Sequence, residues 1–133
     1  MVDDQTKTQA TSILVAETEI TARVSLSELL RDEGYLVVEA ADSGSALTQI
    51  SRDQTIKVIL ADLEMPSWTT IIQQARANLP NSFILGMVRY GALPNAYQAQ
   101  QLGANTHLVK PISFADVNHW IRHYLTGSSQ FKP

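Results

Sequence analysis

Short apolar runs alternate along the chain with longer segments in which apolar residues recur at helical spacing. The continuous runs Ser12–Ala16, Ile56–Leu60 and Phe83–Val88 are typical of strands buried on both faces. Tyr35–Ala40 is rich in β-forming residues, and His107–Val109 is a short apolar run closed by Lys-Pro. The pattern therefore predicts five strands.

The segments between these runs, and the one after the last, predict five helices. Asp42, Ser113 and Pro94 mark three helix starts, while Gly34, Gly103 and Gly127 follow predicted helix ends. Four of the helices have expected apolar positions: Ile20, Val24, Leu26, Leu29 and Leu30; Ala46, Leu47 and Ile50; Ile71, Ile72, Ala75 and Leu79 after the lead-in Trp68–Thr70; and Val117, Trp120, Ile121 and Tyr124. The remaining helix is expected from about Pro94 to Leu102.

Strands that alternate with helices predict a three-layer α/β domain, with a parallel sheet and right-handed crossovers. We expect one domain over residues 12–126. Residues 1–11 are polar and aperiodic and are expected to form a flexible tail. Residues 127–133 are expected to be a second tail or a truncated linker.

Composition narrows the functional classes. The chain has 133 residues, 44% of them hydrophobic and 17% charged, with a net charge of -3. This balance lacks the basic character of a nucleic-acid-binding domain. The absence of cysteine excludes disulfides and thiolate metal sites. No apolar run approaches the length of a membrane span, so we expect a cytoplasmic protein without membrane contact.

Polar residues collect where predicted strands end. Glu17-Thr18 follows the first strand, Asp62 ends the third, Val88-Arg89 ends the fourth and Lys110 follows the fifth. In open parallel sheets, ligands and chemistry gather at this edge. Taken by itself, Asp62 is equally consistent with a residue that only caps the next turn.

The order and spacing of these stretches resemble the receiver domain of response regulators, from Ile13 to about Tyr124. The resemblance rests on Ile13–Glu17, Gly34–Ala40, Asp62 with Met65-Pro66, Gly103-Ala104 and Leu108–Pro111. It implies a flavodoxin-like, doubly wound sheet of five parallel strands in the order 2-1-3-4-5, with helices on both faces.

The resemblance also implies a function. Asp62 matches the residue that accepts a phosphoryl group from a histidine kinase or phosphotransfer protein, and Lys110 matches the cation that contacts this group. Glu17 and Asp62, with the backbone of Glu64, match the ligands of Mg²⁺. The domain would be no enzyme beyond phosphorylating and dephosphorylating itself at Asp62. The Lys110–Pro111 peptide bond should be cis.

Several positions depart from the family pattern. Thr18 stands where the family has a second carboxylate, so Mg²⁺ binding should be weak or absent. Val88 stands where the family has a switch hydroxyl, and His107 replaces the usual aromatic switch residue, although a histidine there also suits the boundary of the core. Arg89 replaces a small residue; it would lie over Asp62 or Glu17, or else point into solvent.

Two acidic side chains and two tryptophans have plainer interpretations. Glu64 would be a solvated loop carboxylate, and Glu19 would point away from the site instead of replacing the missing acid. Trp68 would cover the loop after Asp62 and report Mg²⁺ binding, and Trp120 would belong to the core.

Three functions remain open at this point. The first is a degenerate receiver that acts mainly through protein–protein contacts, on a face formed by the fourth helix, last strand and last helix, with Tyr97, His107 and the exposed side of Ser113–Tyr124. The second is a working phosphoacceptor, and the third a flavodoxin-like metal-dependent enzyme. No glycine-rich loop follows the first strand, which disfavours nucleotide or flavin binding. Homodimerisation stays open.

Overall fold

The computed structural model describes residues 10–127. Within them, five strands alternate with five α-helices. The elements are β1 (Ser12–Ala16), α2 (Ile20–Asp32), β2 (Leu36–Ala40), α3 (Ser43–Arg52), β3 (Ile56–Asp62), α4 (Trp68–Asn78), β4 (Phe83–Val88), the short 3₁₀ helix η1 (Tyr90–Ala92), α5 (Leu93–Leu102), β5 (Thr106–Val109) and α6 (Phe114–Thr126).

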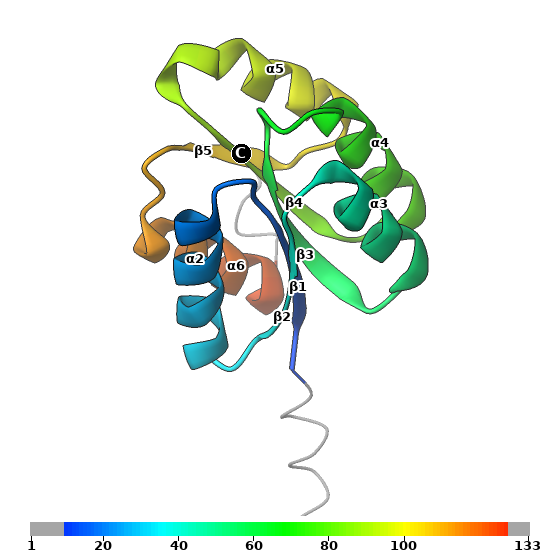
Figure 1. Ribbon diagram of the computed structural model, residues 1–133. Coiled ribbons are helices and arrows are strands. Elements are labelled where there is room, and N and C mark those ends of the chain that lie inside the picture. The colour runs from blue at the N-terminus through cyan, green and yellow to red at the C-terminus, as the bar shows by residue number, and fades with distance from the viewer. Residues whose placement is uncertain (1–9, 128–133) are drawn as a thin grey trace, which may run out of the picture.

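The five strands form one parallel sheet in the order β2-β1-β3-β4-β5, which confirms the predicted topology. Helices α2 and α6 cover one face, and α3, α4 and α5 cover the other (Figure 1). The sheet reverses its winding between β1 and β3. The carboxyl ends of these two central strands therefore meet at a common edge, where Ala16 is in register with Ala61.

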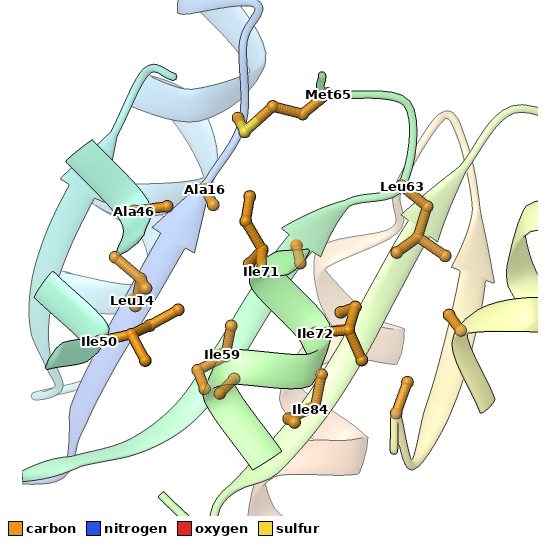
Figure 2. Close-up of a cluster of buried hydrophobic side chains, with 14 of the residues drawn as sticks. Leu14, Ala16, Ala46, Ile50, Ile59, Leu63, Met65, Ile71, Ile72 and Ile84 are labelled. Atoms are coloured by element: carbon orange, nitrogen blue, oxygen red, sulfur yellow. The ribbon is translucent and has the colours of Figure 1, made fainter. Parts of the chain in front are cut away.

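Two hydrophobic cores lie on opposite faces of the sheet. The larger packs side chains of α3, α4 and α5 against Leu14, Ile59 and Ile84 (Figure 2). The smaller packs α2 and α6 against Ile13 and Leu60. Because successive strand residues point to opposite faces, a strand with both faces covered must be apolar at nearly every position.

The helix starts follow the predicted chemistry. The Asp42 side chain accepts a hydrogen bond from Ser45 N at 2.8 Å, and Ser113 accepts one from Asp116 N at 3.3 Å. The sequence prediction missed the cap of α2. Glu19 fills this position, and its side chain accepts from Ala22 N at 2.7 Å.

Two details of the helix prediction were wrong. Ile20, Val24 and Leu29 are 63%, 36% and 43% exposed, so the buried stripe of α2 is narrower and rests on Leu26 and Leu30. Trp68 is the first residue of α4 instead of preceding the helix. Helix α5 agrees with its predicted range of about Pro94 to Leu102, since it begins at Leu93, directly after a 3₁₀ turn. Trp120 is partly buried against the smaller core, as expected.

Gly86 in β4 allows the loop after β3 to pack tightly. A Cβ atom at this position would lie 2.5 Å from Cδ1 of Leu63, which is fully buried. Leu63 directly follows Asp62, and its N–H donates to Met87 O at 2.8 Å. The missing side chain therefore lets β4 fix the loop that carries Asp62.

None of the helices in the part of the chain that the structure describes is long and apolar enough to span a membrane. The predicted tails at residues 1–9 and 128–133 lie outside the described residues.

Candidate functional site

The carboxyl ends of β1, β3 and β5 bring three charged side chains together. Lys110 Nζ lies 3.0 Å from Glu17 Oε1 and 3.3 Å from Asp62 Oδ1. Glu17 and Asp62 are 3% and 5% exposed, so both carboxylates are nearly removed from water. Buried carboxylates need a counter-charge and hydrogen-bond donors, and Lys110 supplies one ammonium group for both.

Both carboxylate oxygens of Asp62 accept hydrogen bonds. Oδ1 accepts from Glu64 N at 3.0 Å in addition to its contact with Lys110. Oδ2 accepts from the Thr18 hydroxyl at 3.3 Å. Asp62 is thus held in one orientation by groups from the β1–α2 loop, the β3–α4 loop and the segment after β5. It does more than cap the turn that follows it.

Glu17 is oriented by its own loop. Its Oε2 accepts from Glu19 N at 3.0 Å. Arg23, one turn into α2, donates from Nη1 to Glu17 O at 2.9 Å, while its Nε lies 3.3 Å from Glu39 Oε1. Arg23 therefore links β2 to the backbone of the loop that carries Glu17. The sequence analysis did not identify this role, because a helical arginine gives no sign of which carbonyl it will reach.

Lys110 is positioned by both backbone and charge. Its N–H donates to Val88 O at 2.8 Å, and the Lys110–Pro111 bond is cis, as predicted. Burial alone would lower the pKa of Lys110. The hydrogen bond to Glu17 and the charge of Asp62 outweigh burial, and together they raise this pKa above the ordinary lysine value.

The structure contradicts the prediction that Glu64 is a solvated carboxylate, and it contradicts one of the two alternatives for Arg89, the position over Asp62 or Glu17. The Arg89 side chain is 75% exposed, as the alternative of a solvent-directed arginine expected, although it also pairs with Glu64. Arg89 lies over neither Asp62 nor Glu17 but pairs with Glu64. Its Nε and Nη2 lie 2.7 and 2.6 Å from Glu64 Oε1, and its N–H donates to Oε2 at 2.9 Å. The Glu64 side chain is only 18% exposed, so it is not a freely solvated carboxylate. The sequence could not reveal this contact, because it joins two loops that are 25 residues apart.

The Arg89–Glu64 pair changes the charge state of the loop after β3. The hydrogen bond from the Arg89 side chain is the main reason that the pKa of Glu64 is lowered. The same carboxylate raises the pKa of Arg89, with a smaller contribution from the charge of Asp62. Arg89 and Asp62 are therefore close enough to interact electrostatically, although they form no direct pair.

The two remaining predicted positions lie beside this edge of the sheet. Val88 is fully buried at the end of β4. His107 in β5 is partly buried, and its ring meets the Tyr97 ring edge-on with 6.4 Å between centroids. An aliphatic Val88 can donate no hydrogen bond to a group bound at Asp62.

Several oxygen atoms at this edge of the sheet are candidate ligands for a metal ion. The described residues contain no group of three or more His, Cys, Asp or Glu side chains that could hold a metal ion. Glu17 and Asp62 supply two carboxylates, while Thr18 contributes only a neutral hydroxyl. Mg²⁺ prefers oxygen ligands and often binds through one or two carboxylates and several waters, so these residues fit this ion.

Comparison of the sequence with known protein families identifies the family of this chain. The sequence model of the response regulator receiver domain matches residues 13–122. The chain belongs to this family. Receiver domains are modules of two-component signalling that interact with histidine kinases or phosphotransfer proteins, and they typically bind Mg²⁺ in their active site.

Individual relatives are similar over most of the receiver domain. The chain is 26% identical to sporulation initiation phosphotransferase F of Bacillus subtilis (strain 168), covering 85% of the chain and 92% of that protein. It is 30% identical to the transcriptional regulatory protein PdtaR of Mycobacterium tuberculosis (strain ATCC 25618 / H37Rv), covering 79% of the chain but only 52% of that relative.

A solved structure supports the fold. The CheY-like receiver domain protein of Methanospirillum hungatei JF-1 has a TM-score of 0.83 at 23% identity, covering 93% of this chain and all of that one. The receiver fold over the described residues is therefore shown independently by sequence and by shape.

Proposed function

We propose that this receiver domain has an altered phosphorylation site, with Asp62 as a weak phosphoacceptor, and that it signals mainly through protein–protein contacts. One observation carries the proposal. The group that contacts Asp62 Oδ2 is the neutral hydroxyl of Thr18 at 3.3 Å, where the family has a second metal-binding carboxylate.

Weak metal binding follows from the charges around Asp62. Glu17, Asp62 and the backbone of Glu64 would hold Mg²⁺, which supplies positive charge to the phosphoryl group when it is bound. The Lys110 ammonium already neutralises one of the two buried carboxylates. A dication gains less from two carboxylates and one ammonium group than from a site in which the same ammonium group faces three carboxylates.

The missing hydroxyl at Val88 weakens the response to phosphorylation. A hydrogen bond to a charged group contributes about 1.5–3 kcal/mol. In a switch whose two states differ by a few kcal/mol, losing that bond shifts the populations by a factor of about ten or more. Phosphorylation of Asp62 therefore biases the conformation of this domain less than a hydroxyl at position 88 would allow.

The proposed partner surface consists of α5, β5 and α6. Tyr97 on α5 is 59% exposed, and its ring contacts His107 on β5. A partly exposed aromatic pair that joins α5 to the edge strand β5 suits a protein partner, since aromatic side chains contribute strongly to interfaces. The functional domain in this proposal spans residues 12–126 and acts in the cytoplasm, with a histidine kinase or phosphotransfer protein upstream. A homodimer is a further possible assembly of this domain.

Intact-mass measurement tests the proposal. The chain is incubated with an acyl phosphate and Mg²⁺, and the fraction that gains one phosphoryl group is followed over time. We expect slow and partial labelling that disappears in Asp62→Asn. Thr18→Asp combined with Val88→Thr should increase labelling more than either change alone, because both act on the same phosphoryl group.

The alternative function is that of an efficient phosphoacceptor. The contacts of Lys110 with Glu17 and Asp62 favour it, because the acceptor and its cation are both in place. Complete labelling of the unaltered chain within minutes would establish this alternative and overturn the altered-site proposal.

A further inference from the structure

Arg89 and Glu64 form a closed contact between two loops at the rim of the Asp62 site. All three contacts described above converge on one carboxylate, from the Arg89 main chain and from its side chain. The Arg89 side chain nevertheless remains 75% exposed. A guanidinium that is held by one exchangeable partner and surrounded by water can change partners at little cost.

An open cleft of about 550 Å³ lies at this rim, and both Arg89 and Asp62 line it. Thr18, Glu64 and Lys110 line the same cleft. Arg89 therefore shares a continuous space with the acceptor carboxylate. The charge of Asp62 already contributes to the raised pKa of Arg89. A phosphoryl group on Asp62 would carry more negative charge into that space than the carboxylate does.

We propose that Arg89 contacts the phosphoryl group on Asp62, and that it is paired with Glu64 only while Asp62 is unphosphorylated. On phosphorylation of Asp62, the Arg89 guanidinium leaves Glu64 and donates to the phosphoryl oxygens. It thereby supplies a hydrogen bond that Val88 cannot provide. This inference rests on the proposed function in one respect, namely that Asp62 accepts a phosphoryl group at all.

The chemistry of the two side chains supports this exchange. A planar guanidinium matches the spacing of phosphoryl oxygens and forms strong, charge-assisted pairs with them. Val88 precedes Arg89 directly and has no donor, while Lys110 is already shared between two carboxylates. Glu64 competes with the phosphoryl group for the same donors, so it favours the unphosphorylated state.

The labelling reaction itself balances without a further reactant. An Asp62 carboxylate oxygen forms a bond to phosphorus as the bond from phosphorus to the acyl oxygen of the donor breaks. The leaving group departs as a free carboxylate with the bonding electron pair, and no proton transfer is required. Arg89 stabilises the charge on the transferring oxygens and does not react.

Two single variants separate this role from a structural one, because they should act in opposite directions. Arg89→Ala should slow labelling of Asp62 by an acyl phosphate by about tenfold, since it removes the donor. Glu64→Gln weakens the competing pair and keeps the Glu64 backbone contact with Asp62, so it should speed labelling severalfold. In an Arg89→Ala background, Glu64→Gln should have no further effect.

Matched controls and a direct readout complete the test. Arg52→Ala in α3 and Glu28→Gln in α2 make the same changes of charge at exposed positions outside the site. Both variants should leave labelling unchanged. Beryllofluoride with Mg²⁺, which mimics the phosphoryl group, should shift the Arg89 Nε resonance in the unaltered chain. The shift should be absent in Asp62→Asn.

Three outcomes would overturn the inference, and a fourth would overturn only the proposed function. If Arg89→Ala and Glu64→Gln both speed labelling, the pair only covers the site; if neither changes it, the contact is structural. If no variant is labelled and beryllofluoride leaves Arg89 Nε unmoved, Arg89 has no phosphoryl group to bind, while the proposed protein-interaction role stands. Rapid labelling of the unaltered chain would overturn the altered-site function, but it would leave the opposite signs of the two variants measurable.

Discussion

At the scale of single residues, a single ammonium group is the counter-charge that the two buried carboxylates of the site share. Lys110 contacts both Glu17 and Asp62, and its side chain is only 23% exposed. Removing one partner of a buried ion pair leaves the other partner desolvated and uncompensated. The stability of this edge of the sheet should therefore depend strongly on Lys110.

We expect Lys110→Met to lower the free energy of unfolding by about 3 kcal/mol at neutral pH, as measured by urea denaturation. Lys57→Met, at an exposed position in β3, should change it by less than about 0.5 kcal/mol. An equally small effect of Lys110→Met would show that Glu17 and Asp62 do not need this cation.

The pH dependence of Lys110→Met has a defined sign. The pKa of Lys110 is raised in the folded chain, so its contribution is fully present below the ordinary lysine value of about 10.4. It is lost as the pH rises through the raised folded value. On the alkaline side, the difference in stability between Lys110→Met and the unaltered chain should narrow as the pH rises through that range.

At the scale of elements, one arginine joins three segments on the side of the sheet covered by α4 and α5. Arg76 in α4 donates from Nη1 to Pro80 O at 2.8 Å and to Ser82 O at 3.0 Å. Its Nη2 donates to Gly103 O at 2.8 Å and to Asn105 Oδ1 at 2.9 Å. The end of α4, the entry to β4 and the turn between α5 and β5 thus share one guanidinium.

The backbone around Arg76 is adapted to this contact. Gly103 has a φ of 128°, which side-chain-bearing residues rarely adopt, and a Cβ there would lie 3.0 Å from the Arg76 side chain. Burial is the main cause of the lowered pKa of Arg76. The guanidinium therefore gives up solvation in order to bind backbone carbonyls.

We expect Arg76→Met to lower the free energy of unfolding by about 2–4 kcal/mol, because several partly buried acceptors lose a charged donor together. Arg76→Lys should recover only part of this loss, since an ammonium cannot reach as many acceptors in one plane. Arg52→Met, at an exposed position in the last turn of α3, is the control. If thermal or urea unfolding gives the same free energy of unfolding for Arg76→Met and Arg52→Met, the contacts of Arg76 contribute nothing to stability.

At the scale of the whole molecule, the Asp62 site and global stability are linked through Mg²⁺. An ion that binds only the folded chain stabilises it by RT ln(1 + [Mg²⁺]/Kd). With Mg²⁺ near its dissociation constant this is about 0.4 kcal/mol, and at a hundredfold excess it is about 2.7 kcal/mol. Thermal unfolding therefore measures metal affinity without any phosphoryl chemistry.

We expect the unfolding midpoint of the unaltered chain to rise by only about one or two degrees in millimolar Mg²⁺. Thr18→Asp should increase this rise, because it adds the missing carboxylate, and it should lower stability in the absence of the ion through repulsion. Trp68, partly buried at the start of α4, gives a fluorescence signal for the same titration. A large midpoint rise in the unaltered chain, lost in Asp62→Asn, would show that Glu17 and Asp62 suffice for tight binding.

The sequence by itself determined the architecture. Strands covered on both faces must be continuously apolar, and the helices between them carry apolar stripes, so Ser12–Ala16 and Phe83–Val88 were predicted with their observed bounds. The meeting of Glu17, Asp62 and Lys110 also followed from the sequence. Each residue ends or follows a strand, and the carboxyl ends of parallel strands share one edge.

Only the tertiary structure decided which side chains pair at the rim of the site. The sequence cannot state that Arg89 selects Glu64 over Asp62, nor that Ile20 and Val24 remain exposed on α2. Strand and helix patterns arise from local periodicity and burial. The partner of a long charged side chain depends instead on distances between loops that are far apart in the chain, and these distances exist only after the sheet has assembled.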